Sequence, residues 1–146
     1  QGYNLKPADL QGSIGLVQLT KQDEIHRIRR SNKARLHEIF SQIPGARVIE
    51  EKEHAETSWF GVPIVCDDHK HRLVKYLEDH KVQTRNYFAG NILMHPAYRH
   101  IEPARNYPNA CKVLDNVFFV GCSPVITEPM LEYIGEVVSN YVSENY

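Results

Sequence analysis

The sequence lacks the features that would assign it to several common classes of protein. Its 17 Lys and Arg residues are balanced by 18 Asp and Glu residues, for a formal net charge of −1. A nucleic-acid-binding domain usually carries a marked basic excess instead. No apolar run approaches the roughly 20 residues that cross a bilayer, and no signal-peptide pattern opens the chain. We therefore expect neither a nucleic-acid partner nor a membrane partner.

Cysteine is scarce as well. The three cysteines, Cys66, Cys111 and Cys122, are dispersed and show no Cys-x-x-Cys spacing. This pattern favours neither a disulfide framework nor a zinc site, so we expect reduced thiols in a cytoplasmic protein and no metal centre. His69 and His71 follow two aspartates, but their spacing does not place two ligands on one helix face. A solvated helix start is the simpler interpretation of that segment.

What the sequence does contain is a full domain of helical and extended patterns. Its 146 residues, 42% of them hydrophobic, are enough to build a core. The chain begins Gln-Gly-Tyr-Asn and enters a helical pattern almost at once. We therefore expect residues 1–146 to be a single small domain and a fragment of a larger polypeptide, holding only part of any active site.

A single long amphipathic helix is predicted over residues 6–43. Apolar residues recur at helical spacing from Leu10 to Ile39, with charged residues on the other face. Pro44-Gly45 ends the pattern. A helix of this length exceeds what one small domain can cover, so we expect another domain or subunit to pack against its first part.

Residues 46–146 have the pattern of a small sheet with covering helices. Strands are predicted over residues 46–49, 58–66, 82–88 and 117–122, and helices from 67 or 68 to 80, over 109–114 and from 127 onwards. Pro63 predicts an edge or bulged position for the second strand. Together with the long helix, this order indicates an α+β fold in which helices cover a small sheet.

The segment "TRNYFAGNILMHPAY", residues 84–98, gathers side chains that could bind a polar ligand. The candidates are Arg85, Phe88, Asn91, His95 and Tyr98. Arg85 carries a planar fork suited to carboxylate or phosphate, and the Gly-Asn pair permits a tight turn. The alternative is a strand end with a surface arginine, a core phenylalanine and an ordinary turn. The residue pattern leaves both interpretations open.

Two further places carry candidate binding groups. In "GYNLK", residues 2–6, Asn4 and Lys6 lie close to the start of the long helix, where free N–H groups and the helix dipole favour anions such as phosphate. The alternative is a helix cap beside a solvated charge. Trp59, next to Phe60, is first a candidate core or interface residue and second a ligand contact. The spacing shows no nucleophilic triad and no phosphate-cradling glycine loop.

Four segments together resemble a known family. "GYNLKPADLQGSIGLVQL", "SWFGVPI", "TRNYFAGNILMHPAY" and "EPMLEYIGEVV" resemble the C-terminal small domain of the DegT/DnrJ/StrS family. These are sugar-nucleotide enzymes with the aspartate-aminotransferase fold (fold type I). Within the family the chain is most similar to the NDP-4-keto-6-deoxyhexose 3-dehydratases, those of the RfbH type that act on CDP-4-keto-6-deoxyglucose among them. Aminotransferases of the family more often carry "NYR" and a Tyr-x-Pro-x-His pattern where this chain has "NLK" and "FAGN".

The resemblance implies roles for particular residues. Asn4 and Lys6 match the segment that reaches the phosphate of the partner subunit's cofactor across a homodimer interface. The sugar-nucleotide cleft is implied to be lined by Arg85, Phe88, Asn91, His95 and Tyr98, with Trp59 flanking it. The catalytic base is expected in the large domain, so no catalytic residue is assigned to this chain.

The implied activity is deoxysugar synthesis for lipopolysaccharide O-antigen. Pyridoxal or pyridoxamine phosphate acts as the electron sink while the sugar nucleotide loses its 3-hydroxyl. Some relatives work with a reductase partner and an iron–sulfur cluster, whose ligands would lie outside this chain. We expect the isolated 146 residues to be inactive. One alternative is a sugar-nucleotide aminotransferase of the same family, and another is a non-catalytic binding or regulatory domain.

Overall fold

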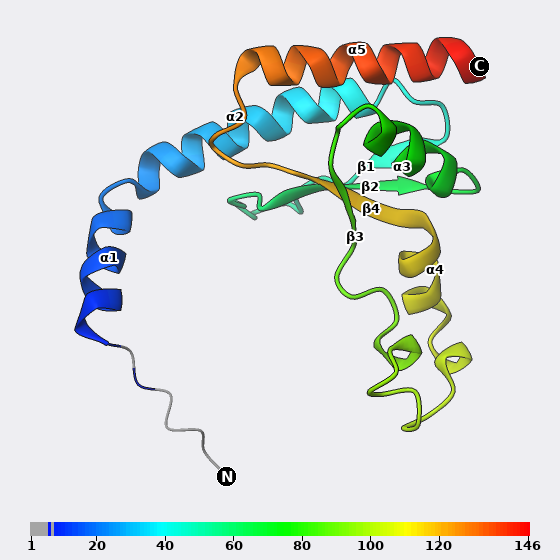
Figure 1. Cartoon of the computed structure of the whole chain (residues 1–146), viewed down its shortest axis with the longest axis horizontal. Coiled ribbons are helices and arrows are strands. Elements are labelled where there is room, and N and C mark those ends of the chain that lie inside the picture. Colours follow the sequence, from blue (N-terminus) through cyan, green and yellow to red (C-terminus); the bar gives the residue numbers. More distant parts are fainter. Residues whose placement is uncertain (1–5, 7) are drawn as a thin grey trace.

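The computed structural model describes Lys6 and residues 8–146 and contains a four-stranded antiparallel sheet (Figure 1). The strands are β1 (Ala46–Val48), β2 (Gly61–Cys66), β3 (Thr84–Asn86) and β4 (Val117–Gly121), in the spatial order β1-β2-β4-β3. The α-helices are α1 (Asp9–Leu19), α2 (Gln22–Phe40), α3 (Lys70–Asp79), α4 (Pro108–Asn116) and α5 (Glu128–Asn145). Two 3₁₀ turns, η1 (Ile92–Met94) and η2 (Ala104–Asn106), lie in the loop between β3 and α4. The predicted α+β class is confirmed.

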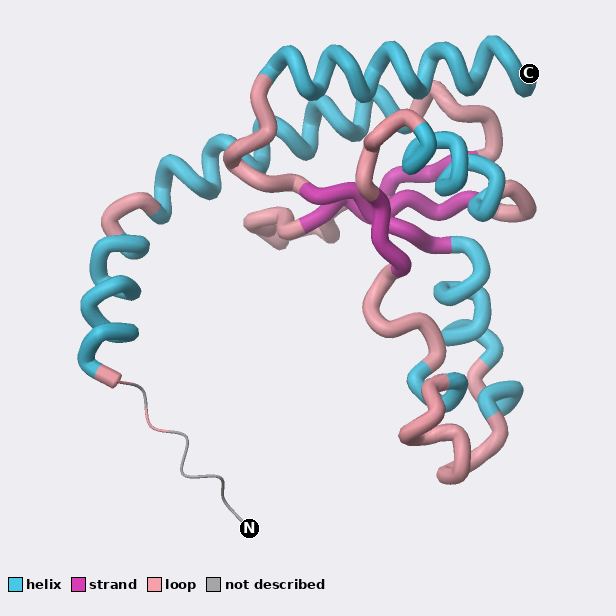
Figure 2. Tube along the Cα trace, in the orientation of Figure 1, coloured by secondary structure: helices cyan, strands magenta, loops and turns pink. Residues whose placement is uncertain are grey.

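The core lies between one face of the sheet and the helices α2, α3 and α5. Side chains alternate along a strand, so every second residue of β2 and β4 points to this inner face. The inner-face residues of the two strands are Val62, Ile64, Cys66, Phe118 and Val120, all of them buried. Figure 2 shows α2 and α5 lying side by side over the strands, where Leu36 and Tyr141 close the core.

The N-terminal helical segment differs most from the prediction. In place of one helix over residues 6–43, α1 and α2 are separated at Thr20 and Lys21. The Thr20 hydroxyl donates to the carbonyl of Val17 at 2.8 Å, a local bond that competes with the helical ladder. Figure 1 shows α1 descending away from the sheet, and none of its residues is buried. No helix in the described part of the chain combines the length and apolarity of a membrane span.

The prediction from Pro63 was wrong, because β2 lies in the interior of the sheet between β1 and β4. Pro63 pairs with Phe119 of β4, and its carbonyl accepts from the Ile49 N–H at 3.0 Å. In an antiparallel ladder the nitrogen and the carbonyl of one residue point to the same neighbour. The missing N–H of Pro63 therefore points beyond the end of β1, and the β2–β4 ladder stays complete.

Candidate functional site

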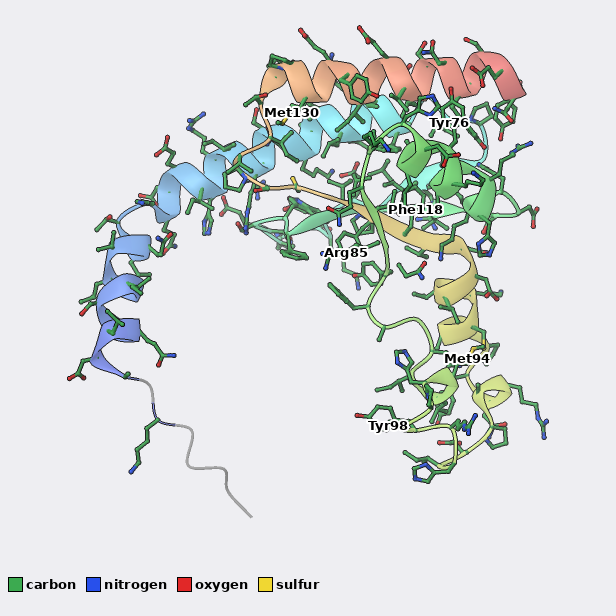
Figure 3. All side chains as sticks on the ribbon, viewed as in Figure 1. Tyr76, Arg85, Met94, Tyr98, Phe118 and Met130 are labelled. Carbon is green, nitrogen blue, oxygen red and sulfur yellow. The ribbon has the colours of Figure 1, made fainter. Side chains whose placement is uncertain are left out.

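The face of the sheet turned away from α2, α3 and α5 carries the candidate site. This outer face consists of Gly61, Pro63, Arg85, Phe119 and Gly121, which pair as Gly61–Gly121, Pro63–Phe119 and Arg85–Phe119. Because side chains alternate, these residues point away from the core that their neighbours fill. In Figure 3, Arg85 lies on the side of the sheet opposite to Met130 of α5.

Three aromatic side chains surround Phe119 on the outer face. The ring centroids of Phe88, Phe60 and Tyr87 lie 5.3, 6.0 and 6.5 Å from the Phe119 centroid. Phe119 is nearly buried by them, whereas Phe60 and Phe88 are 63% and 65% exposed. The four residues border an apolar hollow of about 400 Å³, which we call the aromatic hollow. It offers a surface for a flat or apolar part of a ligand.

Gly61 and Trp59 shape the aromatic hollow. A Cβ atom at Gly61 would come within 2.3 Å of Cδ2 of Phe119, so only glycine allows this ring to lie across β2. Trp59 is 9% exposed and belongs to the core cluster, yet it also lines the hollow. Its predicted core position is therefore observed, and its predicted place beside a sugar-nucleotide cleft stays a prediction.

A second hollow adjoins the first at the edge of the outer face. This arginine pocket, of about 270 Å³, is lined by Arg29 of α2 and Arg85 of β3 together with Gly121 and Ser123. Arg85 is exposed, whereas the Nε atom of Arg29 is shielded from solvent and has no hydrogen-bond partner in the part of the chain that the structure describes. Arg29 did not emerge from the sequence, where it is one of several charged residues in a helical pattern. Only the packing of α2 against the end of β4 brings it to Arg85.

The β3–α4 loop holds the remaining candidates, and Asn91 has a role within the loop itself. Its side chain is 2% exposed. The amide oxygen accepts from the Leu93 N–H at 3.1 Å, and the amide nitrogen donates to the Ala104 carbonyl at 3.0 Å. Gly90, with φ +63°, packs directly against Leu114 of α4. Both ends of the amide therefore hydrogen-bond within the loop, which gives Asn91 a role in its structure. Its predicted contact with the substrate stays a prediction.

His95 and Tyr98 lie farther along the same loop. Both side chains are exposed, and Nε2 of His95 lies 3.0 Å from the Ala89 carbonyl oxygen. Figure 3 places Tyr98 on the projecting part of the loop, far from Arg85. The structure thus gathers Arg85, Phe88 and Trp59 on or beside the outer face. Tyr98 lies apart from them, whereas His95 contacts Ala89, the residue that follows Phe88.

The N-terminal candidates are only partly described. Asn4 lies outside the described residues, and Lys6 is exposed.

Of the three thiols, Cys66 and Cys122 are buried, and burial raises their pKa values to about 12 and about 11. Both thiols are therefore protonated at neutral pH and are poor nucleophiles. Among the described residues, no group of three or more His, Cys, Asp and Glu side chains is arranged to hold a metal ion.

Comparison with known proteins gives consistent matches. Residues 1–139 match the model of the DegT/DnrJ/EryC1/StrS aminotransferase family. The chain is 36% identical to dTDP-4-dehydro-2,6-dideoxy-D-glucose 3-dehydratase of Saccharopolyspora spinosa, a match that covers 99% of this chain and 32% of that protein. It is 29% identical to the lipopolysaccharide biosynthesis protein RfbH of Salmonella typhimurium, over 99% of this chain and 35% of that protein. The chain thus spans about a third of the length of these curated relatives.

The fold matches solved structures of the same kind. E. coli GDP-4-keto-6-deoxy-D-mannose-3-dehydratase with bound hydrated PLP superimposes with a TM-score of 0.79 and 27% identity. This match covers 94% of the chain and 36% of the solved structure. The predicted resemblance to an aminotransferase-fold domain is confirmed by this superposition.

Proposed function

The chain belongs to the DegT/DnrJ/EryC1/StrS aminotransferase family, and we propose that it is the small domain of a PLP-dependent NDP-4-keto-6-deoxyhexose 3-dehydratase. The observation that carries the proposal is the 36% identity to a 3-dehydratase across 99% of the chain. A pathway of deoxysugar and lipopolysaccharide synthesis is supported by the likeness to RfbH. We propose further that the complete enzyme is a cytoplasmic homodimer that works with a reductase partner.

In this proposal the outer face meets the sugar nucleotide. The guanidinium of Arg85 is exposed and suited to an oxyanion of the substrate, and Phe88 offers an exposed apolar surface beside it. A sugar nucleotide held there would be oriented toward the remainder of the active site, which the large domain supplies. Orientation of this kind lowers the barrier by fixing the reacting groups before the chemical step.

The cofactor would be held mainly by the large domain. Pyridoxal or pyridoxamine phosphate supplies an electron sink when bound. From this chain, Asn4 and Lys6 are proposed to reach its phosphate. The exposed side chain of Lys6 is available to an anion, which fits this role. The proton that leaves during dehydration would be taken by a base outside these residues.

The test is the product formed by the complete protein. It is incubated with pyridoxamine phosphate and, in turn, GDP-, CDP- and dTDP-4-keto-6-deoxyhexose, and the products are identified by NMR. We expect one substrate to lose its 3-hydroxyl. A 4-amino sugar that retains the 3-hydroxyl would assign the protein to the aminotransferases instead. No consumption of any of the three would contradict an enzymatic role in this pathway.

A further inference from the structure

The arginine pocket concentrates positive charge that none of the described acidic residues neutralises. Arg29 and Arg85 both line it, and no acidic side chain is among the described residues that border it. Within the described part of the chain, neither arginine forms a salt bridge, although Arg30 and Lys33, close to Arg29 on α2, both do. Two guanidinium groups facing one hollow repel each other unless an anion lies between them.

Arg29 has a donor for which the described residues supply no acceptor. Its Nε atom is shielded from solvent and makes no hydrogen bond to any of them. Almost all shielded polar groups in folded proteins have a partner, and an unpaired charged donor is especially unfavourable. Because Nε itself is shielded, a ligand in the pocket would meet the rest of the Arg29 side chain, which is half-buried and lines the hollow.

The wall that carries Arg29 is fixed in place. The Cys122 thiol donates to the backbone carbonyl of Arg29 at 3.2 Å. One turn further along α2, the buried amide of Asn32 donates to the carbonyls of Ser123 and Ile126 at 3.0 and 3.3 Å. These bonds tie α2 to the segment after β4 that borders the pocket. The position of Arg29 is therefore set by the fold before any ligand arrives.

We propose that Arg29 and Arg85 form an oxyanion subsite that binds a phosphate or a carboxylate of a substrate. This inference rests on the proposed function and assigns a specific role to one part of its site. Planar guanidinium groups suit both anions, because each can donate two parallel hydrogen bonds. Phe60 and Phe119 border both this pocket and the aromatic hollow. This continuity favours the diphosphate of a sugar nucleotide over a small amino-acid carboxylate, because the rest of a nucleotide could lie on the aromatic rings.

The experiment compares three arginine variants of the complete, cofactor-loaded protein by calorimetric titration. Arg29→Gln and Arg85→Gln remove the two charges from the pocket, while Arg47→Gln serves as control. Arg47 is an exposed arginine of β1 at the other end of the sheet, where it pairs with Val65. With inorganic pyrophosphate as the probe, each pocket variant should bind at least about tenfold more weakly. The control should bind within about twofold of the unsubstituted protein, because exposed distant charges are screened by salt.

A substitution that fills the pocket gives an independent check. A Cβ atom at Gly121 would meet no heavy atom within 4 Å, so the fold leaves room for a side chain there. Gly121→Leu should therefore occupy the pocket, weaken pyrophosphate binding at least about tenfold and leave the melting temperature nearly unchanged.

Glutarate serves as the carboxylate probe, because it cannot transaminate. If the two pocket variants lose glutarate binding but keep pyrophosphate binding, the subsite is supported and is assigned to a carboxylate. Unchanged binding of both anions in Arg29→Gln and Arg85→Gln would overturn the subsite. The dehydration assay separates this failure from that of the proposed function. If the unsubstituted protein removes the 3-hydroxyl but the variants bind both anions as well as it does, the subsite is refuted and the proposed function stands.

Discussion

The two faces of the sheet come from the same strands and yet differ in burial: one forms the core, and the other carries exposed side chains. On the inner face, Phe118 is fully buried, and the Thr84 hydroxyl donates to Glu78 at 2.6 Å. One residue along each strand, Phe119 is covered only by other aromatic rings of the outer face, and Arg85 is exposed without a salt bridge among the described residues. The side chains of the inner face are packed or hydrogen-bonded within the described part of this chain, whereas the outer face holds exposed groups that a ligand or another domain could contact. We infer that folding depends on the first face and ligand binding on the second.

The largest expected effect is on the inner face. Phe118→Ala should lower the free energy of unfolding by about 3–5 kcal/mol, because it leaves a cavity in the core. Phe88→Ala on the outer face is the matched control and should change it by less than about 1 kcal/mol, since Phe88 is 65% exposed. Urea denaturation of the complete protein measures both. Equal losses would break the distinction between the two faces.

A substitution of Asn91 tests whether the β3–α4 loop contributes to stability, as the inner face does, or to ligand binding, as the outer face does. Asn91→Ala should destabilise the loop by about 1–3 kcal/mol, because it removes the two hydrogen bonds by which the buried side chain joins the Ala104 carbonyl to the Leu93 N–H. Hydrogen exchange of residues 90–106 reports the local change. Asn106→Ala is the control, since Asn106 makes one exposed bond to Glu102. If Asn91→Ala leaves exchange unchanged and raises the KM for the sugar nucleotide, Asn91 is a substrate ligand after all.

Arg85 should show the reverse behaviour. Arg85→Ala should raise the KM for the sugar nucleotide by about tenfold or more, the value of one lost charge-assisted bond. The free energy of unfolding should change by no more than about 0.5 kcal/mol, because the side chain is exposed. Steady-state kinetics and urea denaturation are measured on the same preparation. An unchanged KM would make Arg85 an ordinary surface residue.

The effect that is smallest at neutral pH concerns the two buried thiols of the inner side. Burial raises the pKa of Cys66 to about 12 and that of Cys122 to about 11, from an ordinary value of 9.0. Above about pH 9 the unfolded chain releases protons that the folded chain retains, so stability falls from there to about pH 12. Below pH 9 the thiols contribute no pH dependence. The double variant Cys66→Ala, Cys122→Ala should flatten this alkaline fall, and an unaltered slope would show that other groups cause it.

Much of the inner face could be predicted from the sequence. The strands and helices that cover the core follow from local patterns, and the α+β class follows from their order. The break at Thr20 could not be predicted, because α1 and α2 both keep the helical period across it. The prediction from Pro63 was wrong because the strand order decides toward which neighbour its nitrogen, which lacks an N–H, points. That order is a long-range property that no local pattern reveals.

The outer face was predictable only in part. Arg85 and Phe88 were found because one short segment holds both. Arg29 was missed because α2 and β3 meet only through the packing of α2 on the end of β4, which no local pattern encodes. The structural role of Asn91 could not be predicted, because it depends on a hydrogen bond to Ala104, which lies 13 residues further along the chain.

Hydrogen–deuterium exchange of the complete protein tests the central distinction most directly. The protein is compared with and without the sugar nucleotide that supports turnover. Ligand should slow exchange in residues 83–90 and 119–123, which form the outer face and the arginine pocket, and leave α5 (Glu128–Asn145) unchanged. Protection confined to α5, or absent from both outer-face segments, would contradict the assignment of the outer face to substrate binding.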